Sequence, residues 1–281
     1  MDGGLVGLRT LEEISYREVT EIEAANKPAD KTKPGTAKPA PRFERKFFIV
    51  PRNIGFAYTF LRQICRPDKE YPQNRVHSLY FDSDELDQFE RSAAGEFKKD
   101  KIRIRWYDDN VEGRETMPVF LELKSREGFA SSKQRQRFVV PSERLEPAQL
   151  ARGIVDRAVL TETLAGFGHF LDSPIRPIIV ISYQRYRFNE MQTGVRVSFD
   201  QDISASVLAP ELGRRDREIR LAGGVIEVKG PTLELPLTLR RMKLLDTDWS
   251  RFSKYGYCLD AHFSGSVSAD RFWPSGRMTE I

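Results

Sequence analysis

The segment KIRIRWY, residues 101–107, places a cation at every second position. Side chains two residues apart on a β-strand lie on the same face, so Lys101, Arg103 and Arg105 would share one side of a strand. Like charges at this spacing repel one another unless solvent screens them or an anion lies between them. The spacing therefore indicates either a solvated surface or an anion-binding surface.

Five further segments repeat this alternation of charged and apolar residues. Their charged faces carry Arg42, Glu44 and Lys46; Glu122 and Lys124; Tyr183, Arg185 and Arg187; Arg196, Ser198 and Asp200; and Glu227 and Lys229. For a single strand, the ordinary explanation of this alternation is a solvent-exposed outer face. Six such strands in one chain favour a barrel whose apolar faces pack against outer helices and whose charged faces line a lumen filled by water and anions.

Phosphate suits such a lumen, because Arg presents a planar fork of donors to its oxygens and Lys presents a compact charge. Three glutamates, Glu44, Glu122 and Glu227, each precede a lysine by two positions. They could serve only to balance charge, or they could hold Mg²⁺ or Mn²⁺ between the protein and the phosphates. Both alternatives remain open for Glu227, and charge balance is favoured for the other two.

These residues must be positioned by strands, and eight segments have the alternation or the β-branched and aromatic bias of strands. They are 43–50, 75–83, 101–107, 118–126, 134–140, 178–189, 195–203 and 224–230. Helices are expected over 51–65, 84–93, 142–151, 154–171 and 235–246, with Ser83 as an N-cap. Together they predict an α+β fold, an antiparallel barrel-like sheet with helices packed outside. Trp106, Phe120 and Phe199 are expected in its core.

Composition limits the classes of protein that remain. The chain has 281 residues, of which 40% are hydrophobic, so it can hold one large domain or two ordinary ones. Lys and Arg number 45 against 41 Asp and Glu, a net charge of +4, which excludes a uniformly basic nucleic-acid coat. Cys65 and Cys258 are far apart and suggest neither a disulfide framework nor a zinc site.

The termini differ in composition from the middle of the chain. Residues 1–41 are expected to be a flexible segment ending in a linker rich in Lys, Pro and Ala. The folded domain is expected over 42–262, followed by a tail over 263–281. The sequence shows neither a signal-peptide pattern nor a run of 18 apolar residues, so we expect a cytoplasmic protein without a membrane span.

The chain resembles the VTC domain, the polyphosphate polymerase domain of vacuolar transporter chaperone proteins, in the triphosphate tunnel metalloenzyme (CYTH-like) superfamily. The matching segments are RFERKF (42–47), SLYFD (78–82), KIRIRWY (101–107), FLELK (120–124), SKQR (132–135), SYQRYRF (182–188), VRVSFD (195–200), IEVK (226–229) and FSKYG (252–256). The resemblance implies a tunnel of eight antiparallel strands that binds a nucleoside triphosphate together with Mn²⁺ or Mg²⁺.

The resemblance also implies a role for each matching residue. The catalytic residues would be Arg103, Arg105, Lys124, Arg185 and Arg196. Substrate would be bound by Lys46, Lys133, Tyr183, Ser253 and Lys254, and the metal by Glu227 with Glu44 and Glu122. Arg135 and Arg137 could extend the tunnel mouth or be solvated. The wider superfamily carries E-x-E-x-K in the first strand, where this chain has Arg42, Glu44 and Lys46, so one acidic ligand is absent.

The implied reaction is transfer of the γ-phosphoryl group of ATP to inorganic polyphosphate, which needs no side-chain nucleophile. ATP and polyphosphate would be its partners, together with a separate membrane protein if synthesis is coupled to translocation, and no nucleic acid is expected. Two alternatives remain. A triphosphatase would use the same tunnel and release orthophosphate, and a binding module would hold polyphosphate without turnover.

Overall fold

Eight long strands form the antiparallel sheet that positions the charged residues. The computed structural model describes residues 43–108, 114–127, 130–213, 218–232, 234–245, 249–250 and 252–264. The long strands are β1 (Phe43–Ile49), β3 (Gln73–Asp82), β4 (Lys98–Tyr107), β5 (Thr116–Glu127), β6 (Ala130–Pro141), β7 (Arg176–Glu190), β8 (Arg196–Val207) and β10 (Gly224–Gly230). The short strands are β2 (Cys65–Pro67), β9 (Ile219–Leu221) and β11 (Trp249–Ser250). The sheet order is β11-β1-β10-β8-β7-β3-β4-β5-β6, with β2 beside β7 and β9 beside β8.

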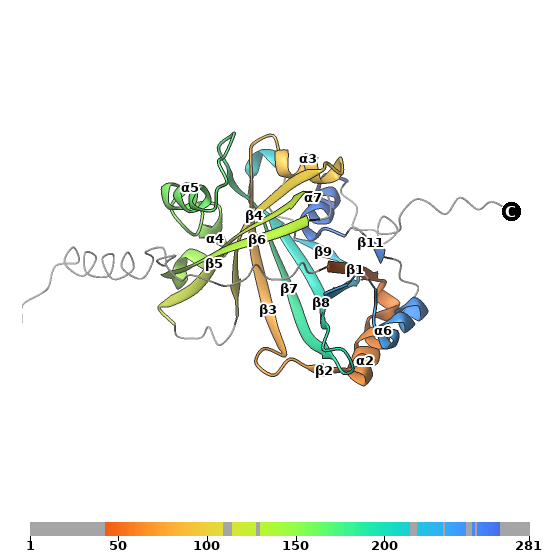
Figure 1. The fold of residues 1–281 in the computed structure, drawn as a ribbon. Coiled ribbons are helices and arrows are strands. Elements are labelled where there is room, and N and C mark those ends of the chain that lie inside the picture. Colours follow the sequence, from red (N-terminus) through yellow and green to blue (C-terminus); the bar gives the residue numbers. More distant parts are fainter. Residues whose placement is uncertain are drawn as a thin grey trace, which may run out of the picture.

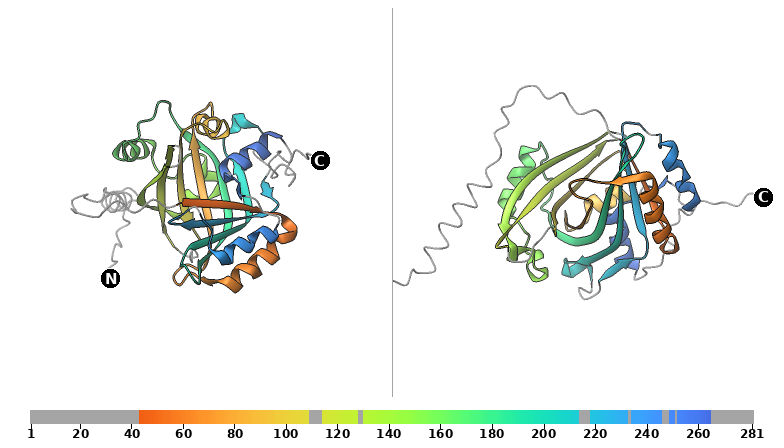
Figure 2. Two further views of the ribbon diagram at one scale, coloured as in Figure 1. Left: turned by 45° about the vertical axis from the view of Figure 1, so that its right-hand side comes forward. Right: turned by 90° about the horizontal axis from the view of Figure 1, so that it is seen from below.

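The sheet curves into a barrel with an open seam. Figures 1 and 2 show its strands wrapped around a common interior with the helices outside. Within the described residues no strand pairing joins β6 to β1. A side-chain ion pair crosses the seam instead, since Lys124 Nζ on β5, the neighbour of β6, lies 3.2 Å from Glu44 Oε2 on β1. The predicted antiparallel barrel of eight strands with outer helices is thus confirmed, and all eight predicted strands are present.

Helices cover the apolar outer face of the barrel at three places, each with its own core cluster. The helical elements are η1 (Pro51–Asn53), α2 (Ile54–Ile64), α3 (Asp87–Ala93), η2 (Ser142–Leu145), α4 (Pro147–Leu150), α5 (Arg157–Gly166), η3 (Pro210–Leu212), α6 (Leu237–Arg240), η4 (Arg241–Leu245) and α7 (Lys254–Ser264). Helices α3 and α7 share one cluster, α4 and α5 a second, and α2 and α6 a third. None of the helices in the described ranges is long and apolar enough to cross a membrane.

The structure corrects several predicted elements. The helix expected over 142–151 is divided at Glu146, which is extended because it precedes Pro147. The helix expected over 154–171 is confined to α5, and the one expected over 235–246 is divided into α6 and η4. Helix α7 was not predicted. The N-terminal segment with its linker, Arg42, and the tail after Ser264 lie outside the described residues.

The start of α3 differs in detail from its prediction. Ser83 Oγ accepts the Asp87 N–H at 3.1 Å, but the N-cap position is Leu86, whose φ of 60° is left-handed. The carboxylate of Asp82 accepts the N–H groups of Gln88 at 2.9 Å and Phe89 at 3.0 Å. Asp82 and Ser83 therefore share the capping that was assigned to Ser83 alone.

Of the three aromatic residues expected in the core, two are there. Trp106 is 5% exposed and Phe199 is fully buried. Phe120 is half-buried and lines a cavity on the inner face, so its prediction was wrong. It alternates in phase with Glu122 on β5, which places it on the charged side of the strand.

Candidate functional site

The register of β4, β5 and β6 aligns their inward side chains in rows. Across the three strands Arg105 lies opposite Phe120 and Arg137, Arg103 opposite Glu122 and Arg135, and Lys101 opposite Lys124 and Lys133. Rows follow at every second residue because inward side chains alternate with outward ones. Local strand periodicity thus builds a ladder of cations along one wall of the barrel.

Glu122 is the buried counter-ion of this ladder. Its carboxylate accepts hydrogen bonds from Arg103 Nη2 at 2.7 Å and Lys133 Nζ at 2.6 Å, and Arg135 Nε lies 3.5 Å away. The residue is only 1% exposed. Burial opposes its ionisation, but the charges of Arg103, Arg105 and Lys133 outweigh burial and hold the pKa of Glu122 well below its usual range. Because these cations surround it, Glu122 positions Arg103 and Lys133. That Glu122 binds a metal remains a prediction.

Asp200 is the buried counter-ion on the opposite wall. Arg185 on β7 donates to both carboxylate oxygens, at 2.6 and 2.7 Å, and Lys254 Nζ donates at 2.5 Å. Asp200 is fully buried. Burial would raise its pKa, but Arg185 and Lys254 lower it to about 2. The fork of Arg185 is therefore held in one orientation.

Glu44 and Glu227 form a pair of carboxylates between these walls. Lys229 Nζ lies 2.5 Å from Glu227 Oε1 and 3.6 Å from Glu44 Oε2, and Lys46 Nζ lies 3.1 Å from Glu44 Oε1. Burial and the neighbouring Glu227 would raise the pKa of Glu44, but Lys46, Lys124 and Lys229 lower it to about 2. Burial likewise opposes ionisation of Glu227, and Lys229 and Lys46 hold its pKa well below its ordinary value.

Two ionised carboxylates supply part of the ligand set that a divalent cation needs. Among the described residues no group of three or more acidic, histidine or cysteine side chains could hold a metal. An Mg²⁺ or Mn²⁺ ion at Glu227 and Glu44 would therefore need further oxygen ligands from phosphate and water. Mg²⁺ commonly binds in this way, through one or two carboxylates plus substrate phosphates.

The start of α7 completes the channel. Lys46 Nζ donates to the Phe252 carbonyl at 3.2 Å, and Lys101 Nζ donates to Ser253 Oγ at 2.6 Å. Lys254 lies over the ring of Tyr183, 4.6 Å from its centre. Arg105 donates to Tyr183 Oη at 3.1 Å. Residues far apart in the sequence thus meet in one network.

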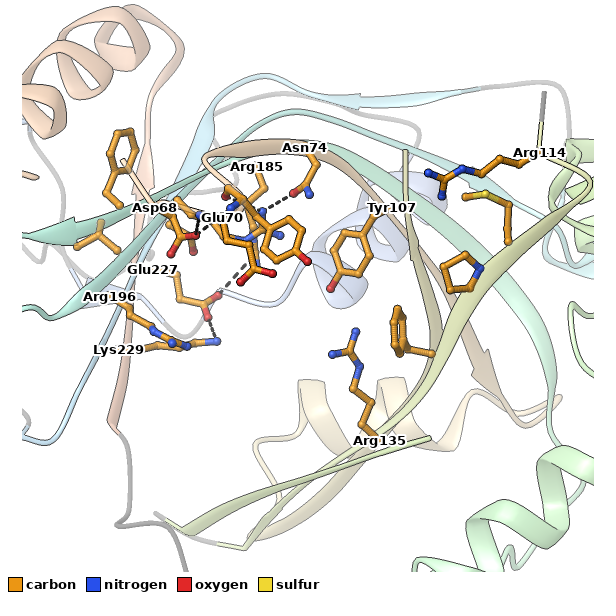
Figure 3. Close-up of a pocket in the computed structure, with 18 residues that line it drawn as sticks. Asp68, Glu70, Asn74, Tyr107, Arg114, Arg135, Arg185, Arg196, Glu227 and Lys229 are labelled. Atoms are coloured by element: carbon orange, nitrogen blue, oxygen red, sulfur yellow. Dashed lines mark hydrogen bonds and ion pairs between the residues drawn. The ribbon is translucent and has the colours of Figure 1, made fainter. Parts of the chain in front are cut away.

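A cavity of about 600 Å³ adjoins this network (Figure 3). Arg185, Arg196 and Glu227 line it, as does Arg135, whose side chain is 40% exposed. Arg137 is exposed. The other predicted site residues lie in the adjoining ion-pair and hydrogen-bond network: Lys46, Arg103, Arg105, Lys124, Lys133, Tyr183, Ser253, Lys254, Glu44 and Glu122.

The structure adds members that the site prediction omitted. Asp200, Lys101 and Lys229 each contact predicted site residues, and Tyr80 Oη accepts from Arg103 Nη1 at 3.1 Å. The signal for the first three was present, because each shares a strand face with a residue that was chosen. Tyr80 had no such signal, since no residue chosen for the site lies on its strand.

One protein family and several solved structures are similar to this chain. The family model of the VTC domain matches residues 41–263. Among solved structures, a proposed adenylate cyclase from Bacillus halodurans is 14% identical, with a TM-score of 0.45, and the match covers 76% of this chain and 94% of that one. A proposed adenylyl cyclase from Hippeastrum, described as having a dominant triphosphatase activity, is 17% identical with a TM-score of 0.42, covering 82% and 98%.

A proposed adenylate cyclase from Vibrio parahaemolyticus is 12% identical with a TM-score of 0.41, covering 80% of this chain and all of that one. No curated protein matches the chain.

Proposed function

Because the chain belongs to the VTC domain family, we propose that it is a polyphosphate polymerase, which transfers the γ-phosphoryl group of ATP to the end of an inorganic polyphosphate chain. The excess of cations in one channel carries the proposal. The cations are Lys46, Lys101, Arg103, Arg105, Lys124, Lys133, Arg135, Arg185, Lys229 and Lys254, against the carboxylates Glu44, Glu122, Asp200 and Glu227. A polyanion would relieve the repulsion among them.

The channel would act by alignment and charge neutralisation. A terminal oxygen of the polyphosphate attacks the γ-phosphorus of ATP, the bond from that phosphorus to the β,γ-bridging oxygen breaks, and ADP leaves. This displacement needs no side-chain nucleophile. Arg103, Arg105, Lys124, Arg185 and Arg196 would neutralise charge on the transferring group, and Lys46, Lys133, Tyr183, Ser253 and Lys254 would hold the phosphates on either side.

Glu122 and Asp200 would act through these cations. Each is buried and fixes an arginine fork by hydrogen bonds, which preorganises donors for phosphate oxygens. Glu227 and Glu44 would hold the Mg²⁺ or Mn²⁺ ion, whose chemistry is to neutralise charge on the phosphate oxygens.

The test is to incubate the purified protein with ATP and Mn²⁺ or Mg²⁺ and to follow the products by gel electrophoresis and ³¹P NMR. We expect long-chain polyphosphate and ADP from the wild type. Arg103→Ala and Glu227→Gln should each lower the rate by about 100-fold or more, the loss typical of a deleted charge-stabilising group. Arg157→Ala, an exposed arginine on α5, is the matched control and should retain the wild-type rate.

Other products would replace the proposal with one of its alternatives. Orthophosphate without chains would identify a triphosphatase. Tight binding of added polyphosphate without turnover would identify a binding module.

A further inference from the structure

The cavity beside the channel has a different chemical character from the channel itself. Four of the residues that line it, Arg185, Arg196, Glu227 and Lys229, belong to or border the phosphate network. The other lining residues include aromatic rings and acids, among them Tyr71, Tyr107, Phe120, Asp68 and Glu70. Figure 3 shows the ring of Tyr107 and the guanidinium of Arg135 pointing toward one another, with Glu227 and Lys229 to their left.

Planar groups are prominent among the residues that line the cavity. The rings of Tyr107 and Phe120 meet edge to face, 6.1 Å apart. The guanidinium of Arg135 covers the Phe120 ring at 3.5 Å, and that of Arg187 lies 5.9 Å from the Tyr107 ring. Aromatic rings and guanidinium planes are the surfaces on which nucleic-acid bases stack.

Two carboxylates at the rim do not suit a polyanion. Asp68 Oδ1 accepts the N–H groups of Glu70 at 3.1 Å and Tyr71 at 2.9 Å, which shapes the segment before β3. The segment is fixed to β7, because Asp68 N–H donates to the Arg187 carbonyl at 2.9 Å and Arg187 N–H donates to the Pro72 carbonyl at 2.8 Å. Carboxylates held there repel phosphate but accept hydrogen bonds from hydroxyl or amino groups.

We propose that this cavity binds the nucleoside of the substrate, an inference that rests on the proposed phosphoryl transfer from ATP. The base stacks among Tyr71, Tyr107 and Arg135, and the ribose hydroxyls donate to Asp68 or Glu70. The triphosphate then extends inward past Arg185 to the cation ladder. The acceptor chain consequently lies toward the opposite end of the ladder, where Lys99 and Arg126 face each other across β4 and β5.

The experiment compares the dissociation constants of ATP and of inorganic tripolyphosphate by isothermal titration calorimetry. Tripolyphosphate reports on the channel alone, and the difference between the two ligands reports on the nucleoside. Tyr71→Ala is the main variant because Tyr71 is 48% exposed and its loss spares the core. Glu70→Gln tests the rim, and Phe170→Ala, an aromatic 76% exposed and absent from the cavity lining, is the matched control.

We expect Tyr71→Ala to weaken ATP about ten-fold, as for loss of one base-stacking ring, and to leave tripolyphosphate within two-fold of the wild type. Glu70→Gln should weaken ATP and leave tripolyphosphate unchanged or tighter. Phe170→Ala should change neither. The inference is overturned if Tyr71→Ala leaves ATP unchanged or weakens both ligands equally. Failure of the wild type to bind tripolyphosphate would instead overturn the proposed function, so the two failures are distinguishable.

Discussion

Lys101 is the side chain on which the crowding of cations has the largest consequence at neutral pH. Burial, followed by the charges of Lys46 and Lys124, lowers its pKa to about 7. A bound polyanion stabilises the ammonium form and raises that pKa. Below pH 7 the lysine is already protonated, and affinity is at its full value. Above pH 7 binding must first add a proton, so affinity falls as pH rises.

The prediction is that the dissociation constant of tripolyphosphate increases between pH 7 and 8.5, with a smaller increase in Lys101→Met. The slope of log Kd against pH should drop by up to about one, the limit for one titrating group. Part of the slope should remain in this variant, because burial lowers the pKa values of Lys124 and Lys133 to about 8 and they titrate in the same range. Lys98→Met, at the exposed start of the same strand, is the control. Equal slopes in Lys101→Met and wild type would show that Lys101 does not titrate with the ligand.

Strand periodicity accounts for most of what was predictable about individual residues. Twelve of the thirteen predicted site residues lie in the network of ion pairs and hydrogen bonds around the channel, and the thirteenth, Arg196, lines the cavity. Asp200 was missed although it alternates in phase with Arg196. Phe120 was misplaced because an aromatic type suggested the core, whereas its phase with Glu122 places it inside the barrel. Position along the strand was more informative than residue type.

At the scale of elements, Tyr255 anchors α7 to β3 through a buried hydrogen bond and a ring stack. Tyr255 Oη donates to Asp82 Oδ2 at 2.6 Å, and its ring stacks on Tyr80 with centres 4.9 Å apart. Tyr255 is 1% exposed and Asp82 fully buried. Because Ser253 and Lys254 directly precede Tyr255, this contact also fixes their place in the channel.

Tyr255→Phe should lower the free energy of unfolding by about 1–3 kcal/mol, because a buried carboxylate loses a hydrogen-bond donor. It should also weaken tripolyphosphate binding, since Ser253 and Lys254 lose their anchor. Chemical denaturation and calorimetry would measure the two effects. Tyr58→Phe on α2, a partly buried tyrosine outside this contact, should change stability by less than about 0.5 kcal/mol. Unchanged stability in Tyr255→Phe would refute the anchoring role.

The strands were predictable where the helices were not, for a physical reason. Most of the long strands have one charged and one apolar face, so alternation is visible in the sequence. Helix α7 carries Gly256 and a weak apolar stripe, and its burial depends on partners from α3, β3 and β7 that no local pattern reveals. The break in the helix expected over 142–151 could have been predicted from the sequence, because the residue before Pro147 is restricted to extended conformations.

At the scale of the molecule, the charged channel spans the open seam of the barrel. Among the residues that the structure describes, β6 has no strand partner on its outer edge, and β1 at the other end pairs only with β10 and the short β11. The ends are joined by Lys124 and Glu44, whose side chains are 35% and 23% exposed, and a partly exposed ion pair of this kind contributes little by itself. A polyanion in the channel would contact cations from both ends and so link them.

Tripolyphosphate should therefore stabilise the whole domain and not only the residues it touches. A ligand at one hundred times its dissociation constant adds about 2.7 kcal/mol, which for a domain of this size raises Tm by roughly 5–10 °C. Differential scanning calorimetry would measure the shift, and hydrogen exchange should show new protection in β1, β5 and β6. Raising the salt concentration should reduce the shift, because screening weakens the attraction. Sodium sulfate at equal ionic strength is the control, and an equal shift from sulfate would mean that the channel has no preference for a chain of phosphates.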